Sequence, residues 1–245
     1  MSRVVEVRHG GLQITQHVRV SGRLVGTDVA GPICLYARIQ VRSGSVTYLS
    51  GNSTVPVEGC CDVFVPPFTL VQAVLEQCDV TTMAFAFPCQ DGLPAEPLLF
   101  RADNDRLGCP SDAVKRLRTG APGTYIGRVS VPGADAARAK AILDAEYASP
   151  IDISGIAERL RVSPSNLSRA FKRAYGLPPV QYRHHVRIVD ALFRLAEGAV
   201  PLQVFQDVGF DDLSRFYKIF RKVACASPAA YRPLSARNAK TQPHL

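Results

Sequence analysis

The hydrophobic pattern of this chain changes from a period of two to a helical period partway along its length. Residues 33–41 place apolar side chains at every second position, and residues 12–20 alternate in the same way. Such alternation is typical of β-strands. After Asp135 the apolar residues recur at the spacing of one helix face, most clearly over residues 179–197. The change predicts an α+β chain in which a β-structured domain precedes an all-α domain.

Turn-forming residues divide the first half into short segments. Pairs such as Ser21-Gly22, Gly31-Pro32 and Ser43-Gly44 separate the alternating runs. Further strands are predicted at residues 46–49, 62–65, 71–76 and 82–87. Short strands at near-regular spacing predict a small antiparallel β-barrel or sandwich.

Composition suggests where the two domains meet. A short helix is predicted over Ser111–Arg118 with Ser111 as its N-cap, and residues 119–132 are rich in Gly and Pro. We expect a β-domain at residues 1–110, a linker at 111–134, a helical domain at 135–234 and a C-terminal tail at 235–245.

Positive charge is concentrated in the second domain. The chain carries a net charge of +8, yet residues 1–134 are almost balanced, with 12 Lys/Arg against 11 Asp/Glu. Residues 135–245 hold 17 Lys/Arg against 10 Asp/Glu. A basic excess confined to one domain predicts a polyanionic partner for that domain.

The remaining bulk features predict a cytoplasmic protein. No apolar run approaches the roughly 20 residues that span a bilayer, and the N-terminus lacks the apolar segment of a signal peptide. The seven cysteines form no CxxC pair of the kind that binds zinc. We therefore expect reduced thiols, no membrane segment, no metal and no cofactor.

Residues 153–176 predict a helix-turn-helix unit. A short helix with Ile156 and Ala157 on its apolar face is followed by Ser163-Pro164, an N-cap and a proline at the first helical position. Gly176 ends the second helix. Arg and Asn can bond to guanine and adenine edges, and Lys neutralises phosphates. The predicted DNA-contacting residues of this unit are Ser165, Asn166, Ser168, Arg169, Lys172 and Arg173.

The same pattern recurs over residues 201–222, with a turn at Gly209. The predicted DNA-contacting residues of the second unit are Ser214, Arg215, Tyr217, Lys218 and Arg221. Between the units, a helix over residues 179–197 would be about 28 Å long. Such a helix can hold two recognition helices about one turn of B-DNA apart, roughly 34 Å. Arg183 and Lys222 are expected to contact phosphates, and His184 and His185 to lie on the exposed side of the helix.

Residues 135–234 resemble the DNA-binding domain of AraC/XylS-type transcriptional regulators. The matching positions are Ile156, Ala157, Ser163, Pro164, Ser165, Leu167, Ser168, Arg169, Phe171, Lys172, Gly176, Tyr182, Arg187, Ala191, Gly209, Phe210, Asp211, Asp212, Phe216, Phe220, Pro228, Tyr231 and Arg232. The resemblance implies a cytoplasmic bacterial regulator, an activator or repressor, whose partners are double-stranded promoter DNA and RNA polymerase.

The second unit departs from the family pattern at three positions. Phe205 replaces a small alanine, Pro201 replaces an aliphatic residue, and Lys218 replaces an arginine. Lysine is a less specific base reader than arginine. The second unit is therefore predicted to contact chiefly phosphates.

Residues 57–69 resemble the glycine–strand–proline signature of the cupin-like barrel that forms the effector and dimerisation domain in this family. The resemblance implies an unidentified small-molecule effector and a homodimer. Arg38 and Arg42 share one face of a predicted strand, about 13 Å apart, and are the candidate contacts for an anionic effector. A solvated strand face explains the same pair.

Other functions remain open at the sequence level. His9 and His17 fit exposed strand histidines better than metal ligands, and the six cysteines of the first 109 residues leave a thiol or metal sensor as an alternative. The alternative to a specific regulator is a ligand- or partner-binding adaptor with weakened DNA recognition. No motif of a hydrolase, a metalloprotease or a nucleotide-binding enzyme is present, so no catalytic residue is predicted.

Overall fold

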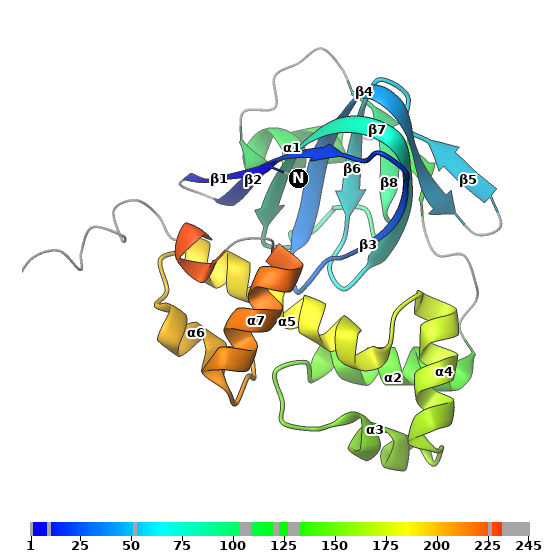
Figure 1. Cartoon of the computed structure of the whole chain (residues 1–245), viewed down its shortest axis with the longest axis vertical. Helices are drawn as coiled ribbons and strands as arrows, with labels where there is room; N and C mark the ends of the chain where they lie inside the picture. Colours follow the sequence, from blue (N-terminus) through cyan, green and yellow to red (C-terminus); the bar gives the residue numbers. More distant parts are fainter. Residues whose placement is uncertain are drawn as a thin grey trace, which may run out of the picture.

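A computed structural model describes residues 2–8, 11–50, 53–102, 109–119, 123–126, 133–224 and 227–231. It contains an antiparallel β-sheet domain followed by a helical domain, as the change of period predicts (Figure 1). The tail at 235–245, His9 and Arg232 lie outside the described residues. Among the described residues, no helix is long and apolar enough to cross a membrane.

Every strand pair in the sheet is antiparallel. The strands are β1 (Ser2–Arg8), β2 (Gly11–Arg19), β3 (Arg23–Val29), β4 (Cys34–Ser50), β5 (Ser53–Pro56), β6 (Cys60–Val65), β7 (Leu70–Phe87), β8 (Leu98–Arg101) and β9 (Thr124–Tyr125). Their order is β1-β2-β7-β4-β6-β8-β9, and β3 and β5 add to β7 and β4, respectively. The long, bent strands β4 and β7 connect most of the others, as Figure 1 shows.

The prediction of uniformly short strands is wrong for β4 and β7. Ser43-Gly44, expected to be a turn, lies inside β4 at a register shift against β7. Gly44 has φ +76°, and a Cβ there would lie 2.2 Å from the carbonyl oxygen of Gln77. Only glycine fits this close approach, so it produces a bulge that bends a continuous strand. Likewise, the segments 71–76 and 82–87 are two parts of one strand, β7.

The sheet is covered on both faces where β4 crosses it. One apolar cluster includes Ile39, Val63 and Val80. On the opposite face, Tyr36 and Phe85 pack against the helix α1 (Pro110–Arg118). Because both faces of the sheet carry buried side chains here, the alternation of apolar and polar residues in β4 does not separate a solvent-exposed face from a buried face.

Part of the expected linker belongs to the sheet domain. Helix α1 begins after Cys109 rather than after Ser111, and the Asp112 carboxylate accepts a hydrogen bond from the Cys109 amide at 3.1 Å. The α1 side chain Leu117 is buried against the sheet. Strand β9 pairs with β8, and the following Ile126 is completely buried. The sheet domain therefore extends to at least residue 126.

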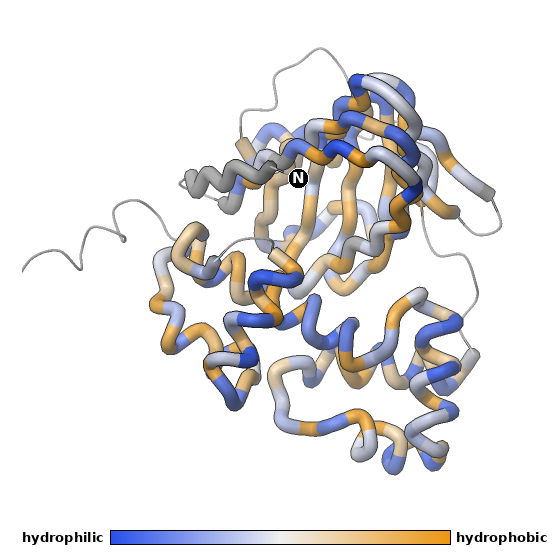
Figure 2. Tube along the Cα trace, in the orientation of Figure 1, coloured by the Kyte–Doolittle hydropathy of each residue, from blue (hydrophilic) through white to orange (hydrophobic). Residues whose placement is uncertain are grey.

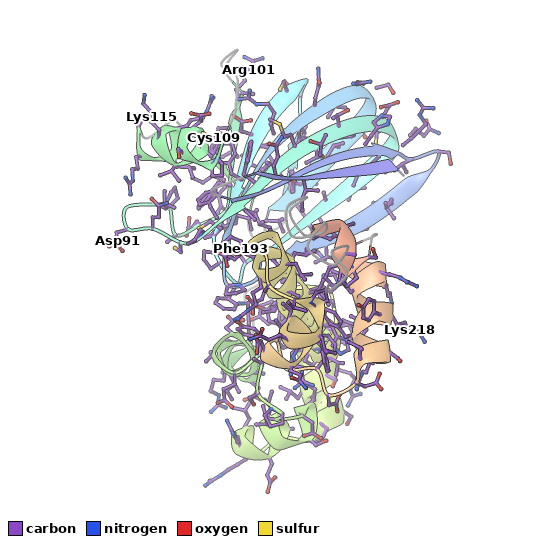
Figure 3. The ribbon with its side chains drawn as sticks, turned by 90° about the vertical axis from the view of Figure 1, so that its left-hand side faces the viewer. Asp91, Arg101, Cys109, Lys115, Phe193 and Lys218 are labelled. Atoms are coloured by element: carbon purple, nitrogen blue, oxygen red, sulfur yellow. The ribbon has the colours of Figure 1, made fainter. Side chains whose placement is uncertain are left out.

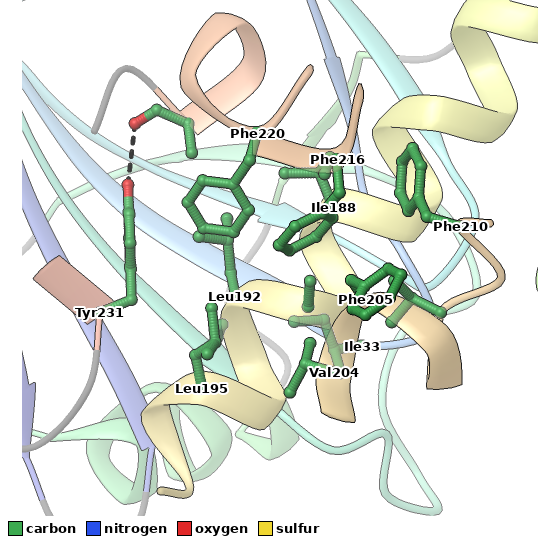
Figure 4. Packing of buried hydrophobic residues seen from close by; sticks show 14 residues of the cluster. Ile33, Ile188, Leu192, Leu195, Val204, Phe205, Phe210, Phe216, Phe220 and Tyr231 are labelled. Atoms are coloured by element: carbon green, nitrogen blue, oxygen red, sulfur yellow. Dashed lines mark hydrogen bonds between the residues drawn. The ribbon is translucent and has the colours of Figure 1, made fainter. Parts of the chain in front are cut away.

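The helical domain follows the predicted elements closely. Its helices are α2 (Ala134–Ala145), α3 (Ile153–Leu160), α4 (Pro164–Tyr175), α5 (Pro179–Ala196), α6 (Pro201–Asp207), α7 (Leu213–Ala224) and the 3-10 turn η1 (Pro228–Tyr231). Each of these elements buries apolar side chains, and hydrophobic and hydrophilic residues alternate along the helices in the tube of Figure 2. Tyr231 closes the end of the domain, since its hydroxyl donates to the Ala224 carbonyl at 2.8 Å (Figure 4).

The two domains share hydrophobic cores. Ile33 and Ala86 of the sheet pack into the cluster formed by α5, α6 and α7 (Figure 4). Val29 and Leu70 join the cluster formed by α2 to α5. The central helix α5 thus contacts the sheet as well as both helix-turn-helix units.

Candidate nucleic-acid interface

The first helix-turn-helix unit consists of α3 and α4, and α4 begins at Ser163-Pro164 as predicted. The Asp152 carboxylate accepts from the Gly155 amide at 2.8 Å and starts α3. Arg161 ends α3 in the left-handed region, with φ +57°. The Ser163 hydroxyl then accepts from the Asn166 amide at 3.3 Å, and Pro164 takes the first position of α4.

Helix α4 presents a polar, basic face to solvent. Leu167, Phe171 and Tyr175 are buried against the rest of the unit. The predicted contact residues Ser165, Asn166, Arg169, Lys172 and Arg173 are exposed, and Ser168 is half-buried. Arg169 donates a hydrogen bond to the Asn166 side-chain oxygen, so two candidate base-reading groups lie together on the helix surface.

Helix α7 presents an equivalent face. Phe216 and Phe220 point inward, and the Asp212 carboxylate accepts from the Arg215 amide at the helix start. The predicted residues Ser214, Arg215, Lys218 and Arg221 are exposed, whereas Tyr217 is half-buried beside Phe216. Figure 3 shows Lys218 on the outer side of α7, away from the sheet domain.

Arg187 connects the two units through the middle of α5. The side chain is only 5% exposed. Its Nε donates to the Tyr147 carbonyl at 2.6 Å and its Nη2 to the Ser149 carbonyl at 2.9 Å, both in the α2–α3 connection. Its guanidinium also lies 5.4 Å from the ring centre of Phe210, in the turn of the second unit. One buried arginine of α5 therefore contacts both the connection that leads into the first unit and the turn of the second unit.

The turn of the second unit packs directly on the α2–α3 connection, which leads into the first unit. Gly209 has φ +86°, and a Cβ at this position would lie 2.1 Å from the Ala148 carbonyl oxygen. No side chain fits that space. The close contact and the Arg187 hydrogen bonds fix how α4 and α7 are oriented relative to each other.

Comparisons with known proteins identify this arrangement. Residues 156–233 match a family described as a helix-turn-helix domain. The arabinose operon regulatory protein of Salmonella typhimurium is 35% identical over 85 residues, which are 34% of this chain and 30% of that protein. The corresponding protein of Escherichia coli is also 35% identical over 85 residues, 34% of this chain and 29% of its own length. The chain therefore spans less than a third of these curated relatives.

The helical domain is an AraC/XylS-type DNA-binding domain. The predicted family resemblance is confirmed for it, and the matched family is one of DNA-binding regulators rather than enzymes.

Solved structures give similarities in fold. The fatty-acid-bound ToxT of Vibrio cholerae has a TM-score of 0.48 and 11% identity, covering 92% of this chain and 96% of that chain. The C-terminal domain of AraT, a response regulator from Geobacillus stearothermophilus, has a TM-score of 0.39 and 25% identity, covering 47% and 97%, respectively.

The departures in the second unit of the AraC-type domain are accommodated by packing. Phe205 is 7% exposed, and its ring centre lies 6.3 Å from that of Phe216. Pro201 occupies the first turn of α6, where the missing amide hydrogen carries no cost. Phe205 packs against α7 and Pro201 fits the start of α6, so these departures from the family pattern do not by themselves remove the DNA-facing surface.

Three basic residues of α5, one arginine and two histidines, are less exposed than the sequence predicts. Arg183 donates to the Ile151 carbonyl and is half-buried. Burial, together with the charge of Arg215, lowers the pKa of Arg183. Burial lowers the pKa of His184 to about 4, with Arg215, Arg183 and Arg187 adding repulsion. His185 is also half-buried and has a lowered pKa, because of burial and Lys222. The expectation of an exposed histidine pair is therefore wrong, since these side chains fill space between helices.

The two arginines predicted for an anionic effector have different surroundings. Arg38 donates to both oxygens of the fully buried Asp62, at 2.8 and 2.9 Å. Tyr36 donates to the same carboxylate at 2.8 Å, and Arg116 of α1 lies 3.5 Å from it. Arg42 is exposed on the far part of β4. The Arg38 guanidinium is thus paired with a carboxylate inside the sheet, and the same carboxylate joins α1 to the sheet through Arg116.

His17, predicted to be an exposed strand histidine, has a carboxylate partner in the sheet. Its Nε2 lies 2.6 Å from the Asp79 carboxylate, which also accepts from Arg19 at 2.8 Å. The groups lie on the paired strands β2 and β7. Hydrogen bonding to Arg19 and His17 lowers the pKa of Asp79. Within the described residues, no cluster of three or more metal-ligating side chains is present.

Sequence reasoning missed the role of Arg187. The residue belongs to the family pattern, but nothing in the sequence separates a buried structural arginine from a surface cation. The available signal was the position of Arg187 four residues before Ala191, an apolar residue that is completely buried.

Proposed function

We propose that the chain is a sequence-specific transcriptional regulator that acts in the cytoplasm on double-stranded promoter DNA. The observation that carries the proposal is the pair of exposed, basic recognition helices, α4 and α7, held in one orientation by α5. Each helix buries its aromatic face and leaves Arg and Lys in solvent. That is the arrangement by which a helix-turn-helix unit enters a major groove.

The two recognition helices have different roles in this proposal. Arg169 and Asn166 on α4 are the residues suited to bonding base edges. Lys218, Arg215 and Arg221 on α7 supply positive charge for the phosphates. Helix α5 has 18 residues, so it is about 27 Å long. This length supports placement of α4 and α7 in successive major-groove segments on one face of the duplex.

The sheet domain would be the effector-binding or dimerisation domain, a cupin-like barrel that controls the DNA-binding domain. Its proposed effector is a small molecule, and its proposed protein partners are RNA polymerase and a second copy of this chain. The shared cores around Ile33 and Val29 support communication between the domains, because they place sheet residues directly on α5 and its neighbours.

The test is a competition between specific and non-specific DNA. Fragments of the host genome retained by the full chain would be sequenced, and the enriched site compared with a scrambled copy at rising salt concentration. The expected result is a specificity ratio of at least about 1,000, with both affinities falling steeply with salt. Equal affinity for the two sequences at every salt concentration would favour the alternative function, a ligand- or partner-binding adaptor with weakened DNA recognition.

A further inference from the structure

Two cysteines meet at one end of the sheet. Cys34 begins β4 and is completely buried, and the register of β4 with β7 places it opposite Phe87. Cys89 follows two residues beyond Phe87, and it is exposed. Cys34 and Phe87 are directly paired, so their side chains lie on the same face of the sheet. If the chain stays extended, Cys89 lies on that face too, diagonally across from Cys34. The Cys89 thiol lies close enough to contribute, after burial, to the raised pKa of the Cys34 thiol.

The surroundings of the two sulfurs are unequal. Cys34 packs in a cluster that includes Tyr36, Phe85 and Phe100. Burial, reinforced by the neighbouring Cys89, raises the pKa of the Cys34 thiol to about 12, so this thiol keeps its proton at neutral pH. Cys89 is the thiol that a dissolved oxidant can reach. Figure 3 shows Asp91, two residues farther along, on an outward loop.

We propose that Cys34 and Cys89 form an oxidisable thiol pair, which a hydroperoxide converts into an intramolecular disulfide. In the first step the Cys89 sulfur attacks the peroxide. An S–O bond forms, the O–O bond breaks, an alcohol or water leaves, and Cys89 becomes a sulfenic acid. In the second step the Cys34 sulfur attacks the Cys89 sulfur. The S–S bond forms, the S–O bond breaks, and the thiol proton leaves with the hydroxyl group as water.

The backbone allows the two residues to approach. A disulfide needs Cα atoms about 4.4 to 6.8 Å apart, slightly closer than the roughly 7 to 8 Å of diagonal neighbours across an antiparallel pair. Cys89 lies beyond the last residue of β7 and follows Pro88. A small movement of the backbone at Cys89, which breaks no hydrogen bond of the β4–β7 pair, is therefore enough to bring the two residues to disulfide distance.

The pair lies beside the contact between the two domains. Ile33 and Leu35, the neighbours of Cys34 in sequence, both pack in the cluster that contains α5. The adjacent Cys60 and Cys61 cannot pair as readily, because neighbouring residues of a strand point to opposite faces. Cys60 is half-buried on β6, which makes it a suitable control thiol.

The test uses the full, reduced chain and one equivalent of hydrogen peroxide. After N-ethylmaleimide quenching, peptides are mapped without reduction. The expected product is a Cys34–Cys89 linked peptide, lighter than the two thiol peptides by two hydrogen atoms and split by dithiothreitol. It should form equally in the Cys60→Ser variant and be absent from Cys89→Ser.

A thermal measurement gives a second readout. Because the disulfide closes a loop of about 55 residues, oxidation should raise the Tm of the wild type and leave that of Cys89→Ser unchanged. Recovery of Cys89 as a sulfinic acid or maleimide adduct, with Cys34 still reduced, would overturn the proposal. A disulfide from Cys89 to any other cysteine would overturn it as well.

Discussion

The exposed side chains of α4 and α7 determine whether each recognition helix can distinguish one DNA base from another. Arg169 is exposed and donates a hydrogen bond to Asn166. The guanidinium and the side-chain amide therefore lie next to each other on the surface of α4. Lys172 is exposed on the same helix, yet its single ammonium group suits phosphate better than a base edge. Two neighbouring cations are therefore expected to differ in how their loss affects specificity.

Replacement of Arg169 by Ala should weaken binding to the selected site by about 1–3 kcal/mol and relax the preference at one base position. The matched variant Lys172→Ala should weaken binding to all sequences by the same factor and flatten the salt dependence. Titration of both variants on selected and scrambled DNA checks this. Equal losses of Arg169→Ala on both DNAs would rule out base recognition by Arg169.

His184 should make the helical domain sensitive to acid. Its folded pKa of about 4 lies below the ordinary value of 6.5, so the unfolded chain binds the extra proton first. The stabilising contribution is therefore complete above pH 6.5 and is lost as the pH falls toward 4. His184→Gln should reduce the loss of Tm between pH 7 and pH 4.5. An unchanged Tm profile in that variant would show that other groups cause the sensitivity.

Among the secondary-structure elements, the helices could be predicted from local sequence patterns and the long strands could not. The helices were predictable because Ser163, Pro164 and Gly176 mark their ends with specific backbone chemistry. The long strands were not, because Ser43-Gly44 has the composition of a turn and only the approach of Gln77 reveals a bulge. The exposed candidate residues of α4 and α7 followed from helical spacing. The contacts of Arg187 depend on residues 40 positions away, which no local pattern contains.

Replacement of Gly209 should test the contact between the two helix-turn-helix units. Gly209→Ala should lower the free energy of unfolding by more than about 3 kcal/mol, because the new Cβ would overlap the Ala148 carbonyl. Gly198 also has a positive φ but has open space around it. Gly198→Ala should cost only about 1–2 kcal/mol. Chemical denaturation measures both, and similar losses would show that backbone conformation alone explains the Gly209 requirement.

Loss of the Arg187 side chain should loosen the arrangement of the two units. Arg187→Met leaves the Tyr147 and Ser149 carbonyls without this donor, at about 1–3 kcal/mol for each buried group. Arg159 forms an exposed ion pair with Glu146, and Arg159→Met should cost about 1 kcal/mol or less. Denaturation of both variants measures the difference. Comparable small losses would show that the Arg187 contacts contribute little.

At the scale of the whole molecule, the domains are not independent modules joined by a linker. Ile33 lies in the core of the helical domain, and α1 and β9 extend the sheet into the expected linker. Thermal unfolding followed by a sheet-sensitive and a helix-sensitive signal should therefore give coincident transitions. Two transitions separated by many degrees would show that the shared cores are energetically weak.

If α4 and α7 enter neighbouring major grooves of one duplex, both should shield guanine N7 atoms on the selected site from methylation. We expect two groups of protected guanines about 10 base pairs apart. Arg169→Ala should remove protection within one group, and Lys218→Ala should weaken the other. A single protected group, or two groups that neither variant changes, would show that the two helices do not bind the duplex in this way.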